Sequence, residues 1–333
     1  MVHRNYFEIE ADSYYELGLR KGELFGEFLR ETLEDRRDSR RWERNTARAR
    51  EFVGVAAANF PYLMDELRGY AQSARVPFDE LWALSLEDEV GDFYYERCTT
   101  IVTNAGSLIA HNEDWDDDAQ DAICVLRKKV GQLHMLELYY LNTLGGNAIS
   151  INSHGFVHAV NSVSHTDRQL GLPKNIVARW LSETKNPDAD IERMARLKRA
   201  SGYHHTLVST DGRIWSLECS ATQQTLTRPT PPFVHTNHFL TGLAEFEGDE
   251  DDGFPGTRSR YRAASEHVRE SMSDDGVTDL VSDRSEGRSR SIFNRRTIAR
   301  MIIDARNKTA KVWLLREEGK GWITYGIDQL MKS

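Results

Sequence analysis

The sequence changes character at residues 98–115, CTTIVTNAGSLIAHNEDW. The run at 99–102 is rich in β-branched side chains, which is typical of a strand, and residues 108–110 form a second short apolar run. The residues between them, 104–107, are Asn-Ala-Gly-Ser, a composition that favours a turn. We therefore predict a β-hairpin whose first strand begins at Cys98.

The residues before this hairpin have helical spacing. From about Asp12 to Asp92, apolar side chains recur at intervals of three and four, and no proline interrupts them before Pro61. Proline followed by acidic residues at Pro61 and again at Pro77 marks two helix starts. The first third of the chain is therefore predicted to be helical, after a short alternating segment around Tyr6.

Short strands separated by glycine-containing turns follow the hairpin, and helical spacing returns between them. This order predicts an α+β protein with antiparallel sheet covered by helices. The predicted strands are 122–129, 134–141, 147–152 and 156–163, then a second block formed by 205–226 together with 233–235, and a closing hairpin of 297–303 against 311–315. The predicted helices lie within 173–200 and around 260–271 and 278–281.

Composition excludes several classes of function. The 333 residues are 39% hydrophobic, enough for a sizeable core, and the net charge of -9 disfavours nucleic-acid binding. The basic run from Arg36 to Arg50 contains Asp38 and Glu43, so we interpret it as a solvated helix face. Since the sequence contains neither an apolar run of about 20 residues nor a secretory signal, we expect no membrane partner and a cytoplasmic location.

The chain has three cysteines, Cys98, Cys124 and Cys219, an odd number without zinc-type spacing. Cys124 and Cys219 lie inside strand patterns and are predicted to be core residues. Cys98 differs, because it begins a strand after a long segment that could serve as a leader. If the bond between Arg97 and Cys98 breaks, Cys98 gains an α-amine with a pKa near about 8, suitable as a base for its own thiol.

Ordered short motifs give the chain a family resemblance. Residues 98–100 and 111–115 resemble the mature start of the penicillin acyltransferase family, whose members are autoproteolytic N-terminal-nucleophile (Ntn) hydrolases. Further matches follow in order at 152–156, Asn161, 235–238 and 259–261, and residues 61–75 of the leader are also similar. The resemblance covers most of the chain and implies a four-layer αββα sandwich, which agrees with the strands and helices predicted above.

The resemblance implies a role for each of five residues. Cys98 is the expected nucleophile, and Asp114 is expected to hold its new α-amine through a charge-assisted hydrogen bond. Asn237 is expected to donate its side-chain amide to the oxyanion hole. Asn161 matches another asparagine near the nucleophile, and Arg260 is expected to support Cys98.

Three features limit these assignments. Arg258 is an alternative to Arg260, because local alignment could shift by two residues. Asp114 and Asn237 are also residue types that bond to nearby backbone in turns, which is the structural alternative to a catalytic role. Bile-salt hydrolases have arginine where this chain has His111, a difference that argues against bile-salt chemistry.

The histidines lack the His-Glu-x-x-His spacing, so we expect neither a metal nor a cofactor.

These patterns lead to one main hypothesis. Residues 1–97 are a helical leader, residues 98–333 are the catalytic chain, and the two remain packed as a heterodimer after self-cleavage between Arg97 and Cys98. The expected reaction is cleavage of a linear amide, a small N-acyl amine, through a thioester. One alternative is acyl transfer to an amine such as a β-lactam nucleus. A second alternative, of another class, is an uncut and catalytically inert binding protein.

Overall fold

The computed structural model describes residues 5–91, 97–248 and 256–330. Its first third is helical, as predicted, after strand β1 (Tyr6–Ala11). Five helices follow: α1 (Tyr14–Arg37), α2 (Arg40–Asn59), α3 (Pro61–Ala74), α4 (Phe78–Ser85) and α5 (Glu87–Val90). Ser13 and Ser39 cap α1 and α2 by accepting backbone N–H groups, and Pro61 opens α3. The end of the predicted helical segment, Asp92, lies outside the described residues.

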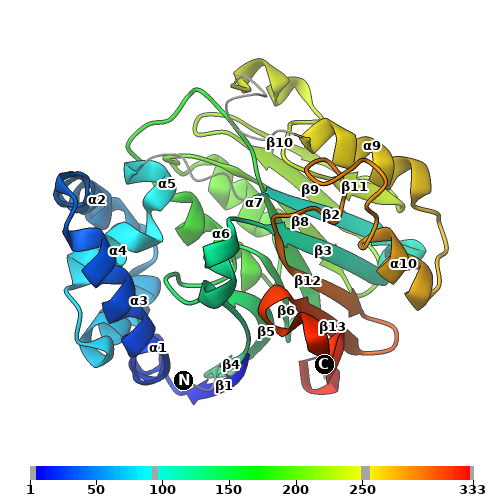
Figure 1. The fold of residues 1–333 in the computed structure, drawn as a ribbon. Helices are drawn as coiled ribbons and strands as arrows, with labels where there is room; N and C mark the ends of the chain where they lie inside the picture. The colour runs from blue at the N-terminus through cyan, green and yellow to red at the C-terminus, as the bar shows by residue number, and fades with distance from the viewer. Residues whose placement is uncertain (1–4, 92–96, 249–255, 331–333) are drawn as a thin grey trace.

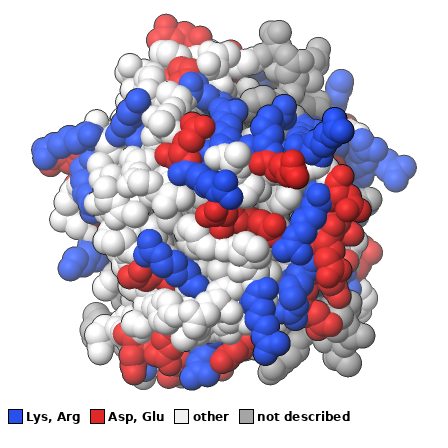
Figure 2. Space-filling model, turned by 90° about the vertical axis from the view of Figure 1, so that its left-hand side faces the viewer, with Lys and Arg blue, Asp and Glu red and all other residues white. Residues whose placement is uncertain are grey.

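The outer face of these helices carries charges of both signs. Figure 2 shows blue and red side chains interspersed over this side of the molecule. Arg37 pairs with Glu80 at 2.6 Å, and Arg50 pairs with Asp79 at 2.6 Å. The basic run is therefore a solvated face with nearby acidic partners, as its mixed composition predicted.

Helices α1 and α3 approach each other closely along a line of glycines. A Cβ atom added at Gly18 would lie 1.9 Å from the carbonyl oxygen of Glu66, and one at Gly22 would lie 2.5 Å from the backbone nitrogen of Ala74. On α3, a Cβ atom at Gly69 would lie 2.1 Å from the carbonyl oxygen of Tyr15. Only glycine leaves room for this backbone contact.

The larger of two sheets has eight strands in the order β1-β4-β5-β6-β7-β8-β9-β10. Neighbouring strands are antiparallel except at one edge, where β1 pairs in parallel with β4. Strand β1, from the first third of the chain, therefore completes a sheet whose other strands all follow residue 122. The strands after β1 are β4 (Ile123–Val130), β5 (Leu133–Tyr140), β6 (Ile149–Asn152), β7 (Phe156–Ser162), β8 (Tyr203–Ser209), β9 (Ile214–Cys219) and β10 (Gln224–Thr227).

The second sheet has six strands in the order β11-β2-β3-β12-β13-β14. Both predicted hairpins are confirmed, as the pairs β2–β3 and β12–β13. The strands are β11 (Phe233–His235), β2 (Arg97–Thr103), β3 (Leu108–Asp114), β12 (Thr297–Asp304), β13 (Thr309–Leu314) and β14 (Ile323–Gly326).

One strand lies in a different sheet from the one that the sequence suggested. Phe233–His235 was grouped with the 205–226 block, but β11 pairs with β2 in the six-stranded sheet. Pro231 and Pro232 precede it, and proline cannot donate to a sheet ladder. The chain therefore leaves the edge at β10 and crosses to the other sheet, which brings the residues after His235 close to the start of β2.

The two sheets and the helices form four layers (Figure 1). On one side, α1 to α5 with α6 (Lys174–Ser182) and α7 (Pro187–Ala195) pack on the eight-stranded sheet through a core that joins Leu17 and Leu63 to Leu126 and Leu217. A second core fills the space between the sheets, and a third lies under α9 (Thr257–His267) and α10 (Asp274–Leu280). The predicted αββα sandwich is confirmed.

The first core includes residues on both sides of position 97, because it contains side chains from the helical third and from the eight-stranded sheet. Residues 5–91 are thus packed as part of the same globular unit as the sheets. In the described parts of the chain, no helix combines the length and the apolar character that crossing a membrane requires.

Candidate active site

Cys98 is the second residue of β2, and its side chain is only 2% exposed. In the β2–β3 hairpin, Cys98 lies opposite Glu113 and Thr100 lies opposite His111. Directly opposed residues share a face of the sheet, so these four side chains lie together. Strand β2 runs unbroken through Arg97 and Cys98, so the structure describes the site before any cut at that bond.

Two predicted residues hold the backbone of Cys98. Its amide nitrogen donates to Asn237 Oδ1 at 3.1 Å. Arg260 donates through Nη1 to the carbonyl oxygen of Cys98 at 2.7 Å and to Thr99 Oγ1 at 2.9 Å, and through Nη2 to Asn237 Oδ1 at 2.7 Å. Sequence reasoning thus named three residues, Cys98, Asn237 and Arg260, that the fold brings into direct contact.

The choice between the two candidate arginines is settled by position. Arg260 is buried, and burial lowers the pKa of its guanidinium. Arg258 has a 55% exposed side chain and pairs with Glu247 at 2.9 Å. Arg260 is therefore the arginine at Cys98.

Local structure explains why Asn237 and Arg260 arrive together. Asn237 follows the end of β11, and its backbone N–H donates to Thr257 Oγ1 at 2.8 Å. Thr257 is the first residue of α9, whose N-cap Gly256 has a φ of 83°. Since residues three apart lie on one helix face, Arg260 emerges beside the loop that Thr257 anchors.

The side-chain amide of Asn237 is partly engaged in this state. Its Nδ2 donates to the carbonyl oxygen of Ser162 at 2.9 Å, while its Oδ1 accepts from Cys98 and Arg260. One of the two amide hydrogens therefore has a protein acceptor before any cut. Its role as an oxyanion donor stays a prediction.

Asp114 lies opposite Arg97 in the hairpin register, one residue from Glu113, which lies opposite Cys98. Its carboxylate is fully buried and accepts from Asn294 Nδ2 and Thr297 Oγ1, each at 2.6 Å. Burial raises the pKa of Asp114, although the guanidinium of Arg260 works in the opposite direction. In the uncut chain Cys98 has no α-amine, so the predicted contact between that amine and Asp114 stays a prediction.

Asn161 approaches the site from the other sheet. It lies on β7, and its Oδ1 accepts from Thr100 Oγ1 at 2.9 Å. The fold therefore places Asn161 next to Thr100, two residues along β2 from Cys98. Its position supports the hairpin from across the core between the sheets.

Sequence reasoning missed the side chains that contact the sulfur. Cys98 Sγ lies 3.7 Å from both carboxyl oxygens of Glu113. Glu113 Oε2 accepts from the hydroxyl of Tyr140 at 3.0 Å, and Oε1 lies 2.7 Å from His111 Nε2. Burial raises the pKa of Glu113 well above its usual range and lowers the pKa of His111 to about 3.

A signal for part of this group was present in the sequence. The predicted turn at 104–107 is centred between Ala105 and Gly106, and counting outward from that centre pairs Cys98 with Glu113 and Thr100 with His111. Tyr140 comes from β5, and no local pattern indicated it.

Three side chains of this group, those of Cys98, His111 and Glu113, offer donor atoms of the kinds that bind zinc. Cys98 Sγ, a ring nitrogen of His111 and a carboxylate oxygen of Glu113 all lie within 4.8 Å of one another. Hydrogen bonds already link these groups to one another and to Tyr140 and Thr100. We therefore interpret the group as a hydrogen-bonded chain.

The other two cysteines, Cys124 and Cys219, are core residues, as predicted, and burial raises the thiol pKa of Cys219 to about 12.

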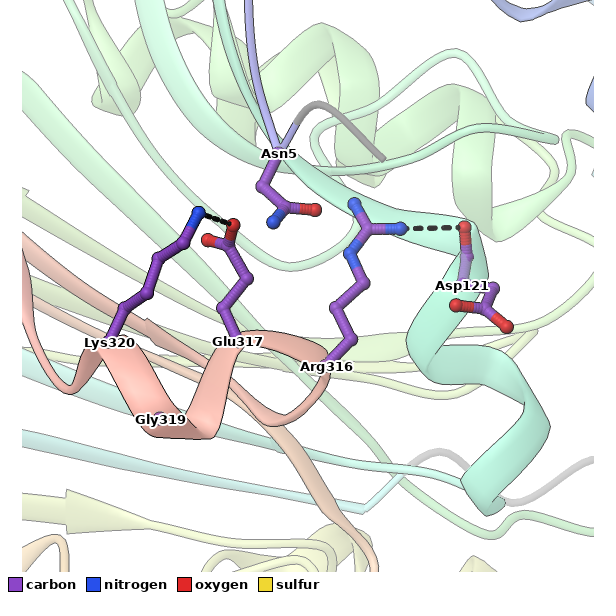
Figure 3. A pocket seen from close by; sticks show the side chains of 6 residues that line it. All are labelled: Asn5, Asp121, Arg316, Glu317, Gly319 and Lys320. Carbon is purple, nitrogen blue, oxygen red and sulfur yellow. Dashed lines mark hydrogen bonds and ion pairs between the residues drawn. The ribbon is translucent and has the colours of Figure 1, made fainter. Parts of the chain in front are cut away.

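Two surface cavities differ in their relation to this site. One, of about 570 Å³, is lined by Asn294 and Thr297, which hold Asp114, and by Arg284, Arg288 and Arg295 among others. The other, of about 340 Å³, is shown in Figure 3. Its lining residues are Asn5, Asp121, Arg316, Glu317, Gly319 and Lys320, and none of them belongs to the group around Cys98. Arg316 there donates to the carbonyl oxygen of Asp121, and Lys320 pairs with Glu317.

A four-layer αββα sandwich with a cysteine at the start of a central strand is the architecture expected of the Ntn class. The chain belongs to a family within it, since the model of the acyl-coenzyme A:6-aminopenicillanic acid acyl-transferase family matches residues 102–318. This confirms the predicted resemblance and places the chain in a family of enzymes. The matched stretch begins just after Cys98 and includes Asp114, Asn161, Asn237 and Arg260.

Individual relatives are more distant. The β-alanyl-dopamine/carcinine hydrolase of Drosophila melanogaster is 27% identical over 161 residues, which are 41% of this chain and 42% of that protein. The match thus spans less than half of the relative's length.

Two solved structures are similar in broad outline. A mutant of the conjugated bile acid hydrolase of Clostridium perfringens aligns with a TM-score of 0.45 and 10% identity over 70% of this chain and 93% of its own. The penicillin V acylase of Agrobacterium tumefaciens aligns with a TM-score of 0.43 and 12% identity over 66% of this chain and 83% of its own.

Proposed function

We propose that this protein is an Ntn amidohydrolase that cleaves its own Arg97–Cys98 bond and then uses Cys98 to hydrolyse linear amides. The observation that carries the proposal is the setting of Cys98. Its sulfur is buried against Glu113, its nitrogen is held by Asn237, and its carbonyl oxygen is held by Arg260. A merely structural core thiol has no need of a charged, fully buried arginine on its backbone.

The cut converts the nitrogen of Cys98 from an amide into an α-amine. Such an amine has an unperturbed pKa of about 8, close to neutral, so it can accept the proton of the thiol on the same residue. Asn237 Oδ1 already accepts a hydrogen bond from this nitrogen. The proposed base is therefore oriented before it becomes basic.

Turnover then follows from the same geometry. The Cys98 thiolate attacks the carbonyl carbon of the substrate amide, and the oxyanion is stabilised by nearby donors, for which Asn237 is our candidate. The α-amine, steadied by Asp114, returns the proton to the leaving amine. Water resolves the thioester and releases the acid.

The substrate that we propose is a small N-acyl amine. The Drosophila relative is described as a hydrolase of β-alanyl-dopamine and carcinine, and this name motivates the first compounds to test. The cavity of about 570 Å³ is our candidate entrance, because Asn294 and Thr297 line it and also hold Asp114.

Acyl transfer is the second candidate, because the matching family is described as an acyl-transferase. The two reactions share the thioester and differ in what resolves it, water or an amine. Adding 6-aminopenicillanic acid to the assay distinguishes them, since transfer produces an N-acylated product at the expense of the free acid.

We also propose that the leader stays bound after the cut, as the first chain of a heterodimer. Three contacts support this, and the first two of them are buried. Lys21 donates to the carbonyl oxygen of Leu144 at 3.0 Å, Arg179 pairs with Glu66 at 3.1 Å, and β1 forms an edge of the eight-stranded sheet. These contacts join residues on the two sides of the proposed cleavage site.

The test is intact mass with N-terminal sequencing of the purified protein after incubation at neutral pH, with Cys98→Ala as the control. We expect two fragments from the wild type, one beginning at Cys98, and a single chain from the variant. The cut protein is then assayed with β-alanyl-dopamine and carcinine. A wild-type chain that stays whole under all conditions would contradict the proposal and favour an inert binding protein on the same fold.

A further inference from the structure

The proposed self-cleavage needs a base for the Cys98 thiol other than the α-amine that serves in turnover. Before the cut, the Cys98 nitrogen is part of a peptide bond and donates to Asn237, so it offers no basic lone pair for the thiol proton. The α-amine that serves as base in the proposed turnover is a product of the cut. Another group must therefore take the proton in the first step.

Glu113 is placed to do this. Both of its carboxyl oxygens lie 3.7 Å from Cys98 Sγ, and hairpin pairing fixes the two residues opposite each other. The Glu113 side chain is buried, and so is His111, whose Nε2 lies 2.7 Å from Glu113 Oε1. Bulk water does not reach this group, so a proton leaving the sulfur passes between protein atoms.

The hydrogen bonds define where the protons are. Thr100 donates its hydroxyl hydrogen to Asn161 Oδ1 at 2.9 Å, so it must accept from His111 Nδ1, also at 2.9 Å. A neutral imidazole protonated on Nδ1 has a free lone pair on Nε2. Glu113 Oε1 must then be the donor to it, which means that Glu113 is a neutral acid in this state.

The raised pKa of Glu113 and the lowered pKa of His111 have the same physical origin, because burial disfavours the charged form of each. A neutral acid between a thiol and a neutral imidazole can pass a proton along without itself becoming charged. It receives one proton on Oε2 and releases another from Oε1. Tyr140, which donates to Oε2, fixes the orientation of the carboxyl group.

Resting on the proposed self-cleavage, we propose that Glu113 and His111 form the proton relay that activates Cys98 in the uncut chain. The thiol proton passes to Glu113 Oε2 while the Oε1 proton passes to His111 Nε2, and Sγ bonds to the Arg97 carbonyl carbon. The carbon–nitrogen bond to Cys98 then breaks, and the proton held as imidazolium ends on the departing nitrogen. The product is a thioester with a free α-amine, an isomer of the starting chain, which water hydrolyses.

The test compares Glu113→Gln with the wild type as full chains. Glutamine can still donate to His111 and accept from Tyr140, but it cannot relay a proton. In the single chain, we expect self-cleavage to slow by about 10²-fold or more, the usual range for losing a general base. All variants are compared as full chains, and the rate of the cut is followed by intact mass.

The controls separate the possible failures. Tyr139→Phe removes the hydroxyl of a neighbouring buried tyrosine, which donates to the carbonyl oxygen of Thr143 at 2.8 Å and lies outside the group around Cys98, so it should still cut. If Glu113→Gln does not fold, which denaturant unfolding reveals, His111→Gln removes the terminal acceptor and should also slow the cut. A wild-type chain that never cuts contradicts the proposed function itself. A wild-type chain that cuts beside a Glu113→Gln chain that cuts equally fast contradicts the relay alone.

Discussion

Arg258 and Arg260 are two residues apart in the sequence, yet of the two it is Arg260 that contacts Cys98. Arg260 is buried and binds both the carbonyl oxygen of Cys98 and the amide oxygen of Asn237, whereas the side chain of Arg258 is 55% exposed. Their difference follows from the helical repeat, since positions two apart on a helix point to different sides.

Arg260→Lys tests this assignment. Lysine keeps the charge but lacks the planar fork that bonds to two acceptors at once. We expect self-cleavage to slow by about tenfold or more, because a hydrogen bond to a charged group is worth roughly 1.5–3 kcal/mol. The rate is followed by intact mass, with Arg258→Lys as the matched control. Equal rates in the two variants would remove Arg260 from the site.

At this scale, sequence reasoning worked where a motif named the residue and failed where a contact depended on pairing. Cys98, Asn237 and Arg260 were named, and the fold joins them. Glu113 belongs to the motif at 111–115, but the motif does not indicate its contact with Cys98, because that contact depends on the pairing of β2 with β3. Tyr140 reaches the group from β5, a strand that pairs with neither β2 nor β3, and no local pattern carries such information.

At the scale of elements, the close α1–α3 contact predicts opposite effects on stability for two glycine substitutions. Gly18→Ala should lower the free energy of unfolding by about 1–3 kcal/mol, because the new methyl group meets the carbonyl oxygen of Glu66. Gly54→Ala, in α2, meets no atom within 4 Å and should raise it by about 0.5–1 kcal/mol. Urea unfolding of both variants on a Cys98→Ala background, which keeps the chain whole, measures the two changes. Effects of the same sign would contradict this account of the contact.

Helices and hairpins were predictable from local spacing, because each depends on residues close in sequence. The assignment of β11 was not, because the eight- and six-stranded sheets have strands of similar composition and the choice between them is made by long-range pairing. The close contact at the glycines of α1 was also not predicted, since it depends on which helix packs against them.

At the scale of the whole molecule, Glu66, in the helical first third of the chain, pairs with Arg179 of α6 and also with Lys21 at 2.5 Å. Burial acts to raise its pKa, but the cations Lys21, Arg179 and Lys128 outweigh burial and lower it to about 2. Because the folded pKa lies below the ordinary value of 4.5, the stabilisation is fully present above about pH 4.5. It is lost as the pH falls from there towards 2.

Glu66→Gln in the cut protein tests this coupling. We expect the free energy that holds the two pieces together to fall by about 3 kcal/mol at neutral pH, since a buried charge loses its partner. Gel filtration in rising urea measures release of the leader. Asp65→Asn, which removes an exposed pair with Arg68, is the control and should change it by less than about 1 kcal/mol. Wild-type pieces that separate without denaturant would show that the shared core does not hold them.

The position of strand β1 at the edge of the eight-stranded sheet has a kinetic consequence for a chain that cuts itself at residue 97. The newly made chain folds as one molecule, so its rate of folding is independent of concentration. Once cut and unfolded, the same atoms form two molecules, and β1 reaches β4 again only after the pieces meet in solution. Recovery of the native sheet then becomes second order in protein concentration, and dilution, which does not affect the uncut chain, prevents the cut protein from reassembling.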